Sequence, residues 1–105
     1  MKTVPEQMEL ARKAQEIVAG YTQKQIDDVC LAVGWEVYRD ENIVKLAHMA
    51  VKETGYGNEQ SKILKHKRKV GGVLHDVKGA VSVGLMERDE IGGISKYAKP
   101  VGVVC

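Results

Sequence analysis

Two cysteines are the side chains in this sequence with the greatest capacity for covalent chemistry. Cys105 ends an apolar run, and Cys30 lies far earlier on a stripe of apolar residues. A catalytic cysteine needs a lowered pKa, which a nearby histidine, a cation or a helix N-terminus supplies. The sequence offers neither cysteine such a neighbour, and their separation matches no zinc-ligand spacing. We therefore predict two free thiols that pack as small apolar side chains.

Three histidines and one run of cations are the other candidates for a binding site. His48, His66 and His75 have no spacing that favours a shared metal ion. The run "KILKHKRK" holds five cations: Lys62, Lys65, Lys67, Arg68 and Lys69. Such a run can bind phosphates, but here no aromatic stacking residues or recognition motif accompany it. A solvated helix face is the favoured interpretation, and a small basic helical module that binds nucleic acid or another anionic partner is the alternative.

Other phosphate-binding and nucleophilic patterns do not appear, and the composition is that of an ordinary globular domain. The glycines form neither a GxGxxG motif nor a P-loop. Among 105 residues, 44% are hydrophobic and 29% are charged, and the formal charge of +2 does not favour a nucleic-acid or membrane partner for the chain as a whole. The N-terminus lacks the apolar core of a signal peptide. With free thiols, we expect cytoplasmic residence.

Capping signals and a 3.6-residue apolar period predict two helices at the start of the chain. Thr3 with Glu6 forms a capping box that opens the first helix. Thr22 with Gln25 forms a second capping box, which opens the next helix. Gly34 lies inside this second helix, where glycine costs about 1 kcal/mol relative to alanine.

Two further helices are predicted before the chain changes character. We expect Asp40 to cap the third helix and Gly55 to end it. Asn58 is the candidate N-cap of a fourth helix, in which Gly71 and Gly72 predict a kink.

The last quarter of the chain changes its apolar period from 3.6 to 2. Alternation over residues 81–85 predicts a half-buried strand, "ERDE" predicts a turn, and "GGISKYAK" predicts a second, exposed strand. Residues 101–105 form an unbroken apolar run, which is typical of a strand buried on both faces of a parallel sheet. Because such a strand needs neighbours that the two preceding strands do not supply, we expect this chain to be the beginning of a larger α/β protein.

Three segments carry a resemblance to a known family. "TQKQIDDVCLAV", "LAHMAVKETGYGNEQSKILK" and "YAKPVGVVC" are similar, in this order, to the N-terminal part of the aldehyde dehydrogenase superfamily. The subgroup they resemble is that of the CoA-acylating acetaldehyde dehydrogenases, which includes the aldehyde-oxidising half of bifunctional aldehyde/alcohol dehydrogenases. One local departure is Lys99, which stands where many members have Glu.

The resemblance implies an α/β fold that is incomplete in residues 1–105. Residues 1–78 would be mainly helical, residues 79–99 would form strands of an oligomerisation arm, and residues 100–105 would be the first strand of a Rossmann-like cofactor sheet. The family uses NAD or NADP and coenzyme A to oxidise a short aldehyde to acyl-CoA through a cysteine thioester, and it forms homo-oligomers.

The same resemblance implies where the chemistry lies. The family's nucleophilic cysteine, oxyanion-binding Asn and cofactor loop fall beyond residue 105, and Cys105 falls in a sheet strand. We therefore expect this segment to be inactive alone, with no catalytic, cofactor-binding or metal-binding residue of its own. Its partner would be the rest of the dehydrogenase chain, with neither nucleic acid nor membrane involved.

Overall fold

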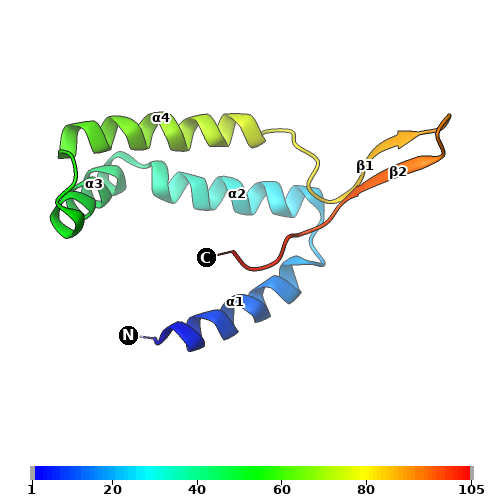
Figure 1. Cartoon of the computed structure of the whole chain (residues 1–105), viewed down its shortest axis with the longest axis horizontal. Helices are drawn as coiled ribbons and strands as arrows, with labels where there is room; N and C mark the ends of the chain where they lie inside the picture. Colours follow the sequence, from blue (N-terminus) through cyan, green and yellow to red (C-terminus); the bar gives the residue numbers. More distant parts are fainter. Residues whose placement is uncertain (1, 105) are drawn as a thin grey trace. The chain divides into compact units, whose positions relative to one another are not determined.

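A computed structural model describes residues 2–104 of the chain. Its elements follow in the order α1 (Val4–Val18), α2 (Gln23–Tyr38), α3 (Asp40–Thr54), α4 (Glu59–Val77), β1 (Gly84–Asp89) and β2 (Ile94–Ala98) (Figure 1). The described residues are thus helix-rich and end in a two-stranded antiparallel sheet, which is consistent with the start of an α/β protein. They form two compact units, one made of the residues up to Ile26 and from Val81 onward, the other of Asp27–Ala80.

Both predicted capping boxes are present. At α1, the backbone N–H of Thr3 donates to Glu6 Oε2 at 2.7 Å, and Thr3 Oγ1 donates to the same oxygen at 2.9 Å. At α2, the N–H of Thr22 donates to Gln25 Oε1 at 2.9 Å, and the N–H of Gln25 donates to Thr22 Oγ1 at 3.3 Å. These bonds satisfy N–H groups at the helix starts that have no intrahelical partner, which confirms where the sequence places the two helix starts.

Capping residues mark both ends of α3 and the start of α4. Arg39 rather than Asp40 is the N-cap of α3, so the predicted cap is wrong by one residue. Asp40 lies in the first turn, where its negative charge is favourable beside the positive end of the helix. Gly55 ends α3 at φ 68°, the left-handed conformation that glycine adopts without steric cost. Asn58 caps α4 as predicted, because its Oδ1 accepts the N–H of Ser61 at 2.9 Å.

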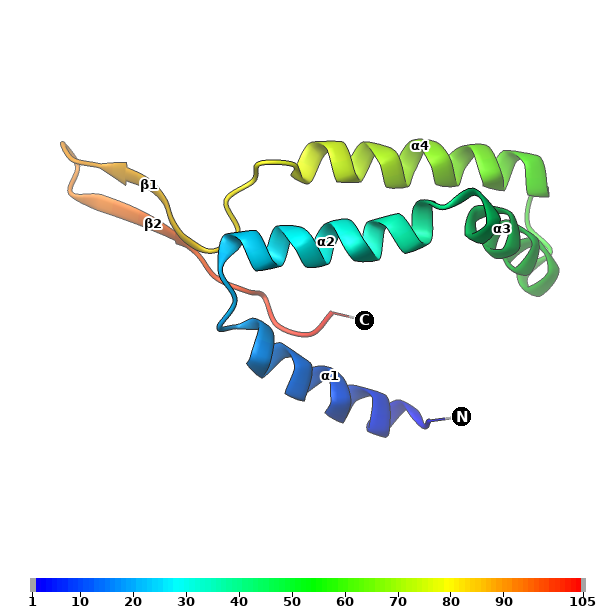
Figure 2. The same cartoon turned by 180° about the vertical axis from the view of Figure 1, so that it is seen from behind.

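The unit made of Asp27–Ala80 is built on contacts among α2, α3 and α4. Its buried residues are Ile43 and Ala47 on α3, at 0% and 2% exposure. α2 and α4 run side by side in both views (Figures 1 and 2). A Cβ atom added at Gly34 of α2 would lie 2.4 Å from Leu74 Cδ2 of α4, so this glycine permits the close approach of the two helices.

The predicted kink in α4 is wrong. α4 is a continuous helix from Glu59 to Val77 (Figure 2). A Cβ atom at Gly71 would lie 3.2 Å from the Tyr38 ring of α2, so Gly71 sits at a helix contact. Gly72 has nothing within 4 Å of its Cβ position and interrupts no hydrogen bonding of the helix.

The hairpin starts later than the apolar alternation predicts. β1 and β2 pair antiparallel from Gly84 opposite Ala98 to Asp89 opposite Ile94, with an irregularity after Leu85. Residues 81–83 therefore lie outside the strand, and the first three residues of "ERDE" belong to β1. The turn follows Asp89, whose Oδ1 accepts the N–H groups of the second and third residues after it, at 3.0 and 2.9 Å.

The apolar run at the end of the described chain is not a strand here. Residues 101–104 have no strand assignment, and Cys105 lies outside the described residues. β1 and β2 pair with each other in a sheet of two strands. A role for residues 100–105 as the first strand of a cofactor sheet therefore stays a prediction. Among residues 2–104, no helix combines the length and apolarity that crossing a lipid bilayer requires.

Candidate functional site

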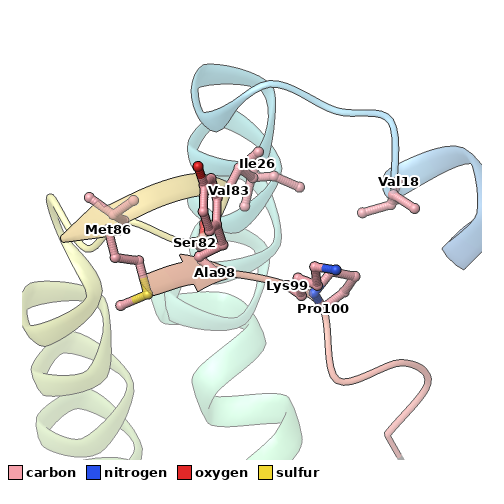
Figure 3. Close-up of a pocket in the computed structure, with 11 residues that line it drawn as sticks. Val18, Ile26, Ser82, Val83, Met86, Ala98, Lys99 and Pro100 are labelled. Atoms are coloured by element: carbon pink, nitrogen blue, oxygen red, sulfur yellow. The ribbon is translucent and has the colours of Figure 1, made fainter. Parts of the chain in front are cut away.

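A pocket of about 780 Å³ lies in the unit that contains α1 and the hairpin. Figure 3 shows side chains that line it, drawn from the end of α1, the first turn of α2 and the base of the hairpin. Its apolar lining includes Val18, Ile26, Val83, Met86 and Pro100. Ser82, Tyr97 and Lys99 are its side chains with polar groups. This lining suits an apolar side chain or ligand, whereas the pyrophosphate of a dinucleotide needs several N–H or cationic donors.

One polar side chain fixes a wall of this pocket. Gln23 opens α2, and its Oε1 accepts the backbone N–H groups of Ser82 at 2.8 Å and of Val83 at 3.1 Å. Its Nε2 donates to Ser82 Oγ at 2.9 Å. Gln23 is not predicted from the sequence, because its partners lie 59 and 60 residues away and no local pattern links them.

Cys30 is an exposed free thiol rather than a packed apolar side chain. It lines a pocket of about 400 Å³ in the Asp27–Ala80 unit, together with Leu74 of α4 and the charged Asp27 and Lys78. The close contact between α2 and α4 lies one turn further on, at Gly34, which leaves Cys30 at the edge of that contact. No histidine is among the residues that line this pocket, so the cysteine–histidine pair of many catalytic thiols is not formed there. Cys105, the other candidate, lies outside the described residues.

The three histidines have separate environments. His48 Nδ1 lies 2.7 Å from Glu59 Oε1, which joins α3 to the first turn of α4. His75 Nδ1 lies 3.5 Å from the carboxylate of its neighbour Asp76. His66 Nε2 is buried without a hydrogen-bond partner among the described residues. Across residues 2–104, no three His, Cys, Asp or Glu side chains gather in a way that could hold a metal ion.

The cationic run lies on α4, and one of its members is paired. Lys67 Nζ lies 2.6 Å from Asp40 Oδ1 at the start of α3. The hydrogen bond to the Asp40 carboxylate, and then its charge, raise the pKa of Lys67 above its ordinary value. Lys65, Arg68 and Lys69 are exposed on the helix, and Lys62 is half-buried. A convex helix face with one cation already paired has the features of a solvated surface.

The sequence of this chain is similar to those of known dehydrogenases. The chain is 81% identical to the sulfoacetaldehyde dehydrogenase (acylating) of Bilophila wadsworthia over 105 residues, which are 100% of this chain and 23% of that protein. It is 63% identical over 94 residues to a sulfoacetaldehyde dehydrogenase of an Acholeplasma species, across 90% of this chain and 19% of that protein. The chain is homologous to the N-terminal part of the acylating aldehyde dehydrogenases.

The subgroup expected from the sequence is also represented among these homologues. An aldehyde-alcohol dehydrogenase of Clostridium acetobutylicum is 29% identical over 104 residues, across 99% of this chain and 12% of that protein. No protein-family model matches the chain. The chain spans about a fifth of the length of these two sulfoacetaldehyde dehydrogenases, which are among the relatives it matches. The resemblance to acylating aldehyde dehydrogenases is therefore confirmed for this segment.

Proposed function

We propose that the full-length protein is a CoA-acylating aldehyde dehydrogenase that acts on sulfoacetaldehyde. The observation that carries this proposal is the 81% identity to the acylating enzyme of that name, which extends over all 105 residues. A second relative that is named a sulfoacetaldehyde dehydrogenase, at 63% identity, supports the choice of aldehyde. The proposed substrate is therefore a sulfonated analogue of acetaldehyde, rather than the acetaldehyde that the family resemblance implies.

The proposed reaction consumes the aldehyde, CoA and oxidised NAD(P), and it yields the acyl-CoA, reduced NAD(P) and a proton. The family resemblance implies a thioester formed on a cysteine. In support of a site elsewhere in the protein, the pocket at the hairpin base is mostly apolar with a single lysine, and no histidine lines the pocket of Cys30. The catalytic and cofactor-binding residues are therefore proposed to lie outside residues 1–105.

The role proposed for this segment is structural. Residues 101–105 would begin the Rossmann-like cofactor sheet, and the hairpin β1–β2 would be an arm that contacts a second copy of the enzyme. In support of the arm, every residue of the two strands except Ala98 is exposed, and Ile91 in the turn is fully exposed. An isolated two-stranded hairpin is marginally stable in water, so covering its faces and edges by another surface would stabilise it.

The test is an assay of the purified full-length protein with each co-substrate left out in turn. We expect nicotinamide reduction with sulfoacetaldehyde that requires CoA, with a kcat/KM above that for acetaldehyde. Absence of activity with either aldehyde would refute the proposed function. Oxidation without CoA that releases the free acid would refute the acylating reaction and leave the dehydrogenase assignment intact.

A Cys30→Ser variant is the matched control for the location of the nucleophile. Because Cys30 lies at the edge of a helix contact and no histidine lines its pocket, this variant should keep wild-type kcat. Loss of thioester formation in Cys30→Ser would place the chemistry inside this segment and overturn the proposed division of roles.

A further inference from the structure

A single side chain holds the segment that leads into the hairpin. The Oε1 atom of Gln23 accepts two consecutive backbone N–H groups, those of Ser82 and Val83, and the Nε2 atom of the same side chain donates to the Ser82 hydroxyl. These bonds join the first turn of α2 to residues 82–83 across about 60 positions of sequence. Figure 3 shows Ser82 and Val83 at the base of the hairpin beside Ile26 of that first turn.

The chemistry of glutamine fits this arrangement. Its carbonyl oxygen has two lone pairs for the two N–H groups, and its NH₂ group supplies the donor for the hydroxyl. The three bonds are exposed, so water can replace them when they are lost. Their removal should therefore change the order of residues 82–83 more than the free energy of unfolding.

The hairpin starts directly after the residues that Gln23 holds. Gly84, the first residue of β1, has φ 79°, and nothing lies within 4 Å of its Cβ position. The conformational freedom of this glycine makes residue 84 a natural pivot. When Gln23 holds residues 82 and 83, the orientation of the hairpin after Gly84 is restricted. When these bonds are lost, the hairpin can adopt a wider range of orientations.

We infer that Gln23 is a positioning residue that aims the β1–β2 hairpin for contact with a second copy of the protein. This inference rests on the proposed role of the hairpin as an assembly arm. An arm that is aimed in the free subunit loses less conformational freedom on association, which favours assembly. Gln23 touches no substrate in this arrangement, and it acts through the position of residues 82–83.

The test compares three variants of the full-length protein with the wild type. Gln23→Leu keeps a branched side chain of comparable bulk and removes all three bonds. Gln23→Glu keeps the acceptor for both N–H groups and places a negative charge at a helix N-terminus, which is favourable. Gln7→Leu is the matched control, because Gln7 Nε2 makes one exposed bond, at 3.0 Å, to the backbone carbonyl of Lys2 at the start of α1.

Two measurements separate positioning from folding. Hydrogen exchange measures the protection of the Ser82 and Val83 amides. This protection should fall about tenfold in Gln23→Leu, as expected for the loss of bonds of ordinary strength. It should persist in Gln23→Glu and in Gln7→Leu. Sedimentation over a dilution series should show an oligomer dissociation constant at least about tenfold higher in Gln23→Leu alone, with circular dichroism unchanged.

Each contrary outcome overturns a different statement. Full amide protection in Gln23→Leu would show that Gln23 does not hold residues 82–83. Lost protection with unchanged assembly would show that these bonds order the loop without aiming the arm. A wild-type protein that is monomeric at all concentrations would overturn both this inference and the proposed assembly arm, while the aldehyde dehydrogenase assay would still test the proposed activity.

Discussion

Replacing Gly34 with alanine tests how closely α2 approaches α4. The added Cβ atom would lie 2.4 Å from Leu74 Cδ2 and 3.0 Å from Leu74 Cδ1, so the leucine or the helices must shift. Alanine gains about 1 kcal/mol over glycine as a helix former, whereas overpacking a helix contact costs about 1–3 kcal/mol. We expect the overpacking to prevail and the free energy of unfolding to fall by about 1 kcal/mol.

The assay is equilibrium urea unfolding followed by far-UV circular dichroism, with Gly72→Ala as the matched control. Gly72 also lies inside a helix, but nothing lies within 4 Å of its Cβ position. Its replacement should therefore deliver only the gain in helix propensity, about 1 kcal/mol of added stability. The two glycine-to-alanine variants should shift the unfolding midpoint in opposite directions.

A double-mutant cycle with Leu74→Ala assigns the cost to one contact. Removing the leucine side chain removes the atoms that the new Cβ meets, so Gly34→Ala should become stabilising in the Leu74→Ala background. The coupling energy between the two sites should be about 1–3 kcal/mol. If Gly34→Ala stabilises the wild type as much as Gly72→Ala does, Leu74 moves away from the added Cβ atom at no cost, and the expected overpacking between α2 and α4 is refuted.

Three further predictions concern a cap, a titrating side chain and the buried core. The backbone hydrogen bond from Thr3 holds the pKa of Glu6 below its ordinary value. The ionised carboxylate should therefore stabilise α1 at pH values above the ordinary pKa, and this stabilisation should be lost as the pH falls through the lowered pKa. In Glu6→Gln, the helix content measured by circular dichroism should depend less on pH. Asn58→Ala should lower the free energy of unfolding in urea by about 1 kcal/mol, and Asn58→Asp should preserve it. Ile43→Ala should cost about 2–5 kcal/mol in the same assay because Ile43 is fully buried, whereas half-exposed Val44→Ala should cost well under that.

The features that the sequence predicts correctly are local. The Thr3–Glu6 and Thr22–Gln25 capping boxes join residues three positions apart, and Asn58 caps α4 through a bond of the same span. Such contacts form within one helical turn, so their residue types and spacing carry the necessary information.

The features that the sequence did not predict depend on contacts between distant segments. Glycine inside a helix indicates either a weak point or a close helix contact, and only the position of Leu74 shows that Gly34 is a contact. Gly71 likewise indicates a kink in the sequence, whereas in the structure its Cβ position faces the Tyr38 ring. The residues before β1 likewise make a long-range contact, since the N–H groups of Ser82 and Val83 donate to Gln23 rather than to a strand.

Large apolar side chains on α2 are exposed in this segment, and the longer homologous proteins indicate what covers them. Of the described hydrophobic residues, only Ile43 and Ala47 are buried, whereas Leu31 and Trp35 on α2 are 65% and 58% exposed. A soluble monomer rarely leaves such large apolar side chains clustered in water. The Leu31–Trp35 face lines a pocket of its own in the Asp27–Ala80 unit, which suits contact with further apolar surface. Since the matched dehydrogenases are more than four times as long as this chain, their additional residues are the natural source of that surface. Trp35→Ala should accordingly destabilise the full-length protein far more than substitution of an exposed residue would, and a cost below about 0.5 kcal/mol in urea unfolding would contradict that packing.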